Sequence, residues 1–284
     1  MFLGPRLAPA LLALLVSGQG PGDAPTALRP APPPAGWSAL APGLELATFD
    51  GPSPARGDGK IWIVRVDLAR HELKVVNASA SDGRPRTVQS WVKGAGGVAG
   101  INAGMFQTDG LTSVGLLRTR LHENNPRRST RYKAMLALDP LRPGEPPLRI
   151  IDAACGEADA LFPAYGTLLQ SIRMVSCDRK NVWAPDAKRW SAAAIAVDGA
   201  GRALFVHARS PWPVHDLVDA LLALPIDLRR AMYLEGGPEA QLYARGAGRE
   251  VERVGAVEGS DPGREGSAFA WEIPNAIVAV PRVR

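Results

Sequence analysis

The carboxylate of Glu235 is followed directly by Gly236 and Gly237, at the end of the short apolar run of residues 231–234. An acidic side chain that ends a buried strand can present its charge at the rim of a sheet. Glycines beyond it lack Cβ, so the backbone can turn with positive φ and approach a ligand closely. A plain strand-to-turn boundary is the alternative interpretation of this stretch taken alone. The case for a site therefore depends on polar residues elsewhere in the chain.

Residues 98–110 have the same design: a short apolar run that contains Asn102, then Gly104, Phe106 and a turn at Asp109. The amide of Asn102 has a donor and an acceptor to satisfy, and either a ligand hydroxyl or a neighbouring loop backbone would do so. These glycines match neither a dinucleotide-binding fingerprint nor a phosphate-binding Walker loop.

Gln170 and Arg173 lie within the apolar run of residues 168–175. An arginine there is costly unless it is paired, so we expect as its partner either a phosphate or a carboxylate, the latter as a structural salt bridge. The candidate site then combines carboxylates, cations and neutral polar groups: Glu235, Asp109 and Glu239; Arg173, Arg189 and Arg209; Asn102, Gln170, Ser191 and His207.

A carboxyl group with a second acid or base beside it suits hydrolysis of a sugar acetal, and arginines suit a phosphate. Together they indicate a substrate that is both sugar and phosphate. A peptidase or a nuclease is a weaker interpretation, because neither a Ser-His-Asp spacing nor a HExxH motif is present. The four histidines lack metal-type spacing, so we expect no cofactor and no transition metal, while a carboxylate-bound Ca²⁺ or Mg²⁺ stays open.

Short β-branched and apolar runs dominate the elements that must position these side chains. We expect strands at residues 44–49, 60–67, 72–77, 134–138, 148–151, 190–198 and 203–209, and one or two more within 268–280. Residues 88–93 are a candidate short helix. The one long helix is expected at 214–224, where the apolar residues form a single face. This pattern predicts an α+β fold: a single domain over residues 37–284 of mixed or antiparallel sheets, with one principal helix and few short ones.

The chain of 284 residues is 46% hydrophobic and carries a formal charge of +5. That length allows a full hydrophobic core. A basic balance suits anionic polymers, phosphate-bearing ligands or nucleic acid, but no nucleic-acid motif is visible, so we expect no nucleic-acid partner.

Residues 1–20 have the layout of a signal peptide, with Arg6 before an apolar run at 7–16 that is too short to span a bilayer. We therefore expect an exported, periplasmic or extracellular protein with no stable membrane span in the mature chain. Residues 21–36 are rich in Pro, Ala and Gly and indicate a linker. In an exported protein the two cysteines, Cys155 and Cys177, are expected to form a disulfide; two buried free thiols are the alternative.

From about Lys60 to Val280 the chain resembles the phosphodiester glycosidase family, through four segments in the family's order. These are Asn102-Ala103-Gly104-Met105-Phe106, Arg189-Trp190-Ser191-Ala192, Leu204-Phe205-Val206-His207-Ala208 and Leu234-Glu235-Gly236-Gly237-Pro238-Glu239. The resemblance implies an exported hydrolase that cleaves a glycosidic bond to a phosphodiester. Glu235, Arg189 and His207 would then be catalytic. Substrate would contact Asn102, Gly104, Phe106, Asp109, Gln170, Arg173, Ser191, Arg209, Gly236, Gly237 and Glu239, with Arg189 and Arg173 on the phosphate.

The chain departs from the family pattern at its central turn. Glu235 stands where the family usually has an aspartate, one methylene shorter, and Pro238-Glu239 replaces a Gly-Ser pair. A misplacement of this size can cost about a hundredfold in rate. This departure motivates a second hypothesis, a non-catalytic module that binds phosphate-containing cell-envelope polysaccharide. In both hypotheses the partner is a sugar phosphate or a phosphate-linked polysaccharide.

Overall fold

The computed structural model describes residues 1, 36–52, 57–256 and 269–283. Contacts divide the chain into two units, Met1–Pro32 and Pro33–Arg284, and the second contains every helix and strand described below. The predicted signal peptide and nearly all of the predicted linker lie outside the described residues. Within the described part of the chain, no helix is both long and apolar enough to cross a membrane.

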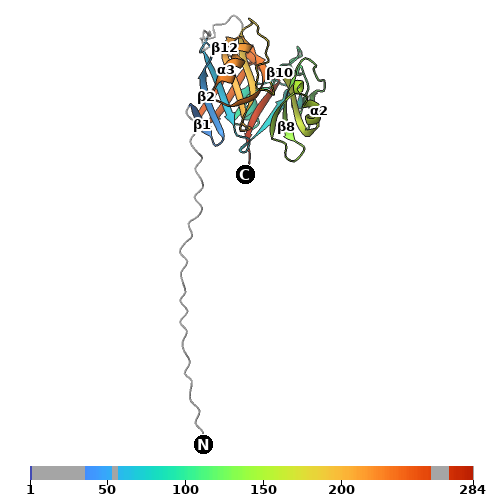
Figure 1. Ribbon diagram of the computed structural model, residues 1–284, viewed down its shortest axis with the longest axis vertical. Coiled ribbons are helices and arrows are strands. Elements are labelled where there is room, and N and C mark those ends of the chain that lie inside the picture. The colour runs from blue at the N-terminus through green and yellow to red at the C-terminus, as the bar shows by residue number, and fades with distance from the viewer. Residues whose placement is uncertain (2–35, 53–56, 257–268, 284) are drawn as a thin grey trace. The chain divides into compact units, whose positions relative to one another are not determined.

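The larger sheet has eleven strands, in the order β1-β2-β3-β12-β11-β13-β10-β6-β7, with β8 beside β10 and β9 beside β8. In Figure 1, β8 lies at the opposite end of this sheet from β1 and β2. The strands are β1 (Trp37–Ala41), β2 (Leu44–Asp50), β3 (Lys60–Val66), β6 (Leu117–Arg118), β7 (Glu123–Asn125), β8 (Ala134–Pro140), β9 (Leu148–Asp152), β10 (Tyr165–Val175), β11 (Trp190–Asp198), β12 (Ala203–Trp212) and β13 (Leu228–Gly236).

The smaller sheet has five strands, in the order β15-β14-β5-β16-β4. These are β4 (His71–Asn77), β5 (Ala99–Asn102), β14 (Gln241–Gly246), β15 (Arg249–Val254) and β16 (Asn275–Pro281). The chain passes from the larger sheet to the smaller one at the end of β13, through the short 3₁₀ helix η4 (Gly237–Glu239). The turn after Glu235 is therefore a junction between the two sheets.

One face of each sheet packs into a shared hydrophobic core, as period-2 alternation of apolar side chains requires. The larger sheet contributes Val64, Ile195, Phe205 and Met232 to this core, and the smaller sheet contributes Val75, Ile101, Leu242 and Ile277. Helix α3 (Val214–Ala223) covers the other face of the larger sheet with Val214, Leu217, Val218 and Leu221. Helix α1 (Val88–Gly94) covers the other face of the smaller sheet with Val88, Trp91 and Val92.

The predicted fold class is confirmed in outline, but sheets dominate more than expected. The long helix predicted at 214–224 is α3, and the short one predicted at 88–93 is α1. The strands predicted at 190–198 and 203–209 are β11 and β12, which pair with each other. Every pairing between named strands of the described chain is antiparallel. The hairpin of β14 and β15 was not predicted, because the charged residues Arg249, Glu250 and Glu252 remove the apolar pattern that marks a strand. Charged side chains are usual on an edge strand such as β15.

The predicted disulfide between Cys155 and Cys177 is present and spans a sequence separation of 22. It joins η2 (Ala153–Cys155), which follows β9, to the segment after β10. The nearby helices α2 (Ala158–Leu161) and η3 (Phe162–Ala164) complete this end of the domain, and η1 (Ala78–Ala80) follows β4. Beside the disulfide, Arg173 Nη1 lies 3.1 Å from both carboxylate oxygens of the buried Asp152.

Replacing both cysteines by serine should lower the free energy of unfolding by about 3 kcal/mol, because closing a loop of this length restricts the unfolded chain. Chemical denaturation of the double variant and of the wild type, with and without reductant, measures this difference. The reductant should lower the free energy of unfolding of the wild type and leave that of the variant unchanged. Equal stability of all four samples would contradict a structural role for the bridge.

Candidate active site

A bulge at the end of β13 turns Glu235 toward the shared core. Ala193 of β11 pairs with Glu235 while Ala194 pairs with Tyr233, so Leu234 and Glu235 together oppose one residue. Directly paired residues lie on the same face of a sheet, and Ala193 belongs to the shared core. Without the extra residue, strict alternation would place Glu235 with Tyr233 on the face that α3 covers.

The carboxyl group of Glu235 is half-buried, and its Oε1 accepts a hydrogen bond of 3.0 Å from the backbone N–H of Gly236. Burial raises its pKa to about 7, and the charge of Glu239 adds to this rise against the lowering effect of the Gly236 bond. Glu239 is also half-buried, and burial raises its pKa as well. The turn therefore holds two coupled carboxyl groups, one of which changes charge near neutral pH.

The two glycines between these carboxyl groups are required by the backbone. A Cβ on Gly236 would lie 2.2 Å from Tyr233 Oη and 2.6 Å from Trp190 Cδ1, and Gly237 has a φ of +61°. A Cβ on Gly255, just after β15, would lie 1.8 Å from the carbonyl oxygen of Gly237. Neighbouring segments thus approach this turn so closely that side chains are excluded, which fixes its path.

Three buried asparagines lie at the ends of neighbouring strands of the smaller sheet, where this turn enters it. Asn102 pairs with Ala276 and so lies on the face that α1 covers, whereas Asn77 and Asn275 lie on the shared-core face. Asn102, the last residue of β5, accepts a 3.1 Å bond from the N–H of Gln241, while its Nδ2 has no partner among the described residues. Asn77 of β4 and Asn275 of β16 are cross-strand partners, and the side-chain oxygen and nitrogen of both lack partners within the described structure. Buried amides cost free energy unless they are hydrogen-bonded, so these three are candidates to bind a hydroxyl-rich ligand.

His207 and Arg209 of β12 and Ser191 of β11 support the junction from the larger sheet. His207 Nε2 lies 3.1 Å from the carbonyl oxygen of Ala240, directly after η4, and burial lowers the pKa of His207 to about 4. Its ring is therefore neutral at pH 7 and donates to that oxygen. Ser191 Oγ donates to the carbonyl oxygen of Arg209 at 2.5 Å, and Arg209 Nη1 donates to that of Val254 at 2.7 Å. His207 and Glu235 lie on opposite sides of Ala193, about two strand spacings or 10 Å apart.

Two other predicted ligand-binding residues are engaged by the protein itself. Gln170 Nε2 donates to the carbonyl oxygens of Ser129 and Tyr132 at 2.8 and 2.7 Å, and so anchors a loop. Arg173 has Asp152 as its partner, which is the structural salt bridge left open by the sequence. The exposed Arg189 directly precedes β11, and its role stays a prediction.

The segment after β5 also has structural contacts. Gly104 has a φ of +78°, and a Cβ there would lie 3.4 Å from Leu169 of β10, so β5 ends against the larger sheet. Phe106 is half-buried and packs beside α1 with the cluster that contains Trp91. The exposed Asp109 closes its own turn by accepting bonds from Thr112, which lower its pKa.

The structure thus brings together Glu235, Gly236, Gly237, Glu239 and Asn102, and adds two residues that were not predicted. Asn77 and Asn275 each end or begin a strand in the sequence, where a polar residue is ordinary. Their pairing is visible only in three dimensions. Among the described residues, the grouping that could present metal ligands is Asp152 with Cys155 and Cys177, whose sulfur atoms are joined in the disulfide.

Comparison with known proteins identifies solved structures with a similar fold. The fold is similar to the catalytic domain of zebrafish N-acetylglucosamine-1-phosphodiester alpha-N-acetylglucosaminidase, auto-inhibited by its pro-peptide, with a TM-score of 0.58 and 11% identity over 86% of each chain. A hypothetical protein from Synechocystis gives a TM-score of 0.63 and 13% identity, over 89% of this chain and 65% of that chain. No curated protein sequence gives a significant match.

At these identities the two solved structures show a shared fold. The sequence itself matches the family model described as phosphodiester glycosidase over residues 95–280. The matched region runs from just before β5 to the end of β16, and so includes Asn102, both carboxyl groups of the turn and Asn275. The chain belongs to the phosphodiester glycosidase family.

Proposed function

We propose that this protein is an exported glycosidase that hydrolyses the glycosidic bond between a sugar and a phosphodiester, in an envelope or extracellular glycoconjugate. The observation that carries the proposal is the half-buried carboxyl group of Glu235, whose pKa is raised to about 7 beside a second carboxyl group. A pKa near the working pH is what a general acid–base group needs, and paired carboxyl groups are the usual machinery of glycoside hydrolysis. Family membership supports the same reaction class.

In the proposed reaction the bond between the anomeric carbon and the phosphate oxygen breaks. Protonated Glu235 donates its proton to that leaving oxygen, which departs as part of a phosphomonoester. Ionised Glu239 accepts a proton from the attacking water, whose hydroxyl group bonds to the anomeric carbon and completes the free sugar. The burial that raises the pKa of Glu235 keeps a proton available near pH 7.

Asn77 and Asn275, which are paired on the shared-core face of the smaller sheet, suit the sugar. Each amide presents a donor, an acceptor or both without a protein partner in the described chain, and sugar hydroxyls both donate and accept. Their burial favours recognition by hydrogen bonds, because a ligand that lacks the hydroxyl would leave the amide unpaired. The neutral His207 holds the junction in place from β12. The disulfide supports the proposal of export, since such bridges persist in oxidising compartments.

The alternative is a module that binds phosphate-containing envelope polysaccharide without cleaving it. It is favoured by one observation: the carboxylate at the end of β13 is a glutamate where an aspartate is usual in the family. A panel of synthetic sugar-1-phosphodiesters separates the two functions, because hydrolysis releases free sugar and binding alone does not.

Replacing Glu235 by Gln should lower kcat/KM on a cleaved member of this panel by about 10²–10⁴-fold, the usual contribution of a general acid–base group. The matched control is Glu252→Gln, the same change at an exposed position of β15, which should keep wild-type activity. Release of free sugar at the wild-type rate by Glu235→Gln would rule out the assigned role.

The pH dependence should identify which form of Glu235 acts. If its proton is donated, kcat/KM falls as pH rises through about 7, the pKa of this carboxyl group in the free enzyme. Initial rates between pH 5 and 9 on one substrate measure the profile. A limb near 7 that rises with pH would show instead that the ionised form acts, as a base.

The same carboxyl group should make the protein less stable at high pH. Its pKa is about 7 when folded against an ordinary value of 4.5, so between these values the unfolded chain loses the proton first and stability falls as pH rises. At pH 8 Glu235→Gln should therefore be more stable than wild type, by on the order of 2 kcal/mol. Near pH 4 the two proteins should melt alike. A variant that is less stable at both pH values would contradict this account.

A further inference from the structure

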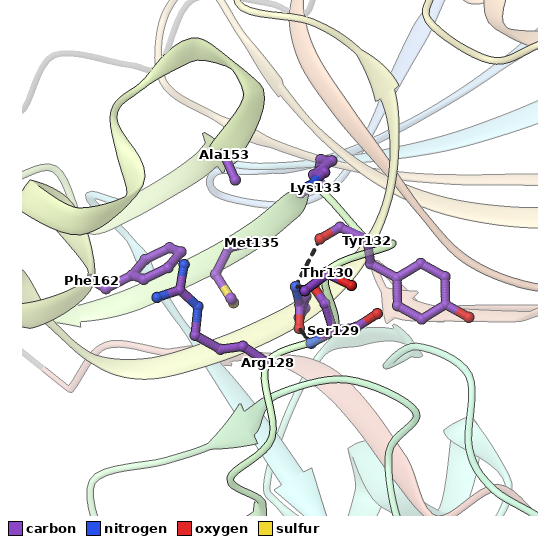
Figure 2. Close-up of a pocket in the computed structure, with 10 residues that line it drawn as sticks. Arg128, Ser129, Thr130, Tyr132, Lys133, Met135, Ala153 and Phe162 are labelled. Atoms are coloured by element: carbon purple, nitrogen blue, oxygen red, sulfur yellow. Dashed lines mark hydrogen bonds between the residues drawn. The ribbon is translucent and has the colours of Figure 1, made fainter.

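A cavity of ≈ 370 Å³ lies where the loop of residues 128–133 meets the start of β8. Figure 2 shows the side chain of Met135 between Arg128 and Phe162 on one side and Ser129 and Thr130 on the other. Neither carboxyl group of the turn lines it. Its volume is within the range of small-molecule sites, and nothing in the proposed reaction uses its side chains.

The wall of this cavity is held in place by a buried side chain. Gln170, which is 5% exposed, donates to the carbonyl oxygens of Ser129 and Tyr132 and accepts from the N–H groups of Ser129 and Leu116, at 2.8 and 3.2 Å. Both the oxygen and the nitrogen of its amide are therefore hydrogen-bonded to backbone groups. A ligand would meet a wall that is already shaped, which reduces the ordering cost of binding.

The charge on this wall is positive. Residues 127–133 contain Arg127, Arg128, Arg131 and Lys133 and no acidic residue, and of these cations Arg128 and Lys133 line the cavity. The guanidinium of Arg128 lies 4.3 Å from the ring centroid of Phe162, which orients it. Its acidic neighbour Asp159 lies 3.6 Å away with a side chain that is 96% exposed, a weak surface pair that an anion can replace.

We propose that this cavity binds an oxyanion carried on a sugar, either a phosphate or a carboxylate. Arg128 would supply planar guanidinium donors, Lys133 a second charge, and Ser129 and Thr130 neutral hydroxyl groups. The ≈ 370 Å³ volume admits a sugar ring together with its anionic group.

Strand β10 links the cavity to β13, the strand that ends in the proposed catalytic turn. Gln170 of β10 pairs with Met135 of β8, and Ile172 pairs with Tyr233 of β13 on the other side. At Gln170 itself the neighbour on that side is the segment before β6, because the N–H of Gln170 donates to the carbonyl oxygen of Leu116 at 2.8 Å. An extended ligand with repeated anionic groups could occupy both places. That use as a second subsite rests on the proposed function, whereas anion binding in the cavity does not.

Titration calorimetry at low ionic strength tests the proposal, with glucose 1-phosphate, glucuronate and neutral glucose as probes. The proteins are the Glu235→Gln chain, which prevents turnover, and the same chain with Arg128→Ala and Lys133→Ala added. The matched control adds Arg127→Ala and Arg131→Ala, which removes two charges from the same loop at exposed positions outside the cavity wall. Melting curves verify that all three are folded.

We expect at least one of the two anionic probes to bind far more tightly than glucose, and the tighter one identifies the anionic group. Replacing Arg128 and Lys133 should lower the affinity for the tighter anionic probe at least tenfold. Replacing the control pair, Arg127 and Arg131, should lower that affinity less than threefold. Equal weakening by both pairs would overturn the proposal in favour of diffuse attraction to a basic surface. Binding of glucose as tightly as the anions, or absence of binding by both anions, would also overturn it. Because no bond is cleaved here, these results are independent of any failure to observe hydrolysis.

Discussion

The turn after β13 must carry the chain from one sheet to the other while it keeps two carboxyl groups out of bulk water. Burial disfavours the charged form of each, and their proximity makes simultaneous ionisation costly. Two features of the backbone satisfy this constraint. One is the bulge at Leu234 and Glu235, and the other is the close approach of Gly255 to Gly237. The raised pKa of Glu235 is thus a direct result of how the two sheets are joined.

The junction is braced from both sheets by groups that are themselves buried. His207 of the larger sheet bonds to the carbonyl oxygen of Ala240, and Asn102 of the smaller sheet accepts from the N–H of Gln241, the next residue. Buried hydrogen bonds of this kind are expensive to break, because each would leave an unpaired polar group in a poorly hydrated place. The single peptide group between Ala240 and Gln241 is therefore held at its carbonyl oxygen by one sheet and at its N–H by the other, which fixes the chain directly after Glu239.

Local patterns in the sequence predict most of the strands and helices, but not β15 and not the contacts between distant residues. The apolar face of residues 214–224 predicts α3, and Glu235-Gly236-Gly237 predicts a functional turn, because both signals are local. Gln170 bonds to the backbone of Ser129, which lies 41 residues earlier in the chain. The partner of Arg173 is Asp152, on another strand. Asn77 and Asn275 come from opposite ends of the domain. Hydrogen-bond satisfaction of such residues is a property of the folded chain and has no sequence signature.

The pairing of β4 with β16 also determines when the smaller sheet can be completed during folding. The strand β4 (His71–Asn77) is synthesised long before β16 (Asn275–Pro281), its only partner in the described smaller sheet. Such remote pairing slows folding, because a long loop must close before any contact rewards it. The smaller sheet therefore stays incomplete, and Asn77 and Asn275 stay apart, until β16 has been synthesised.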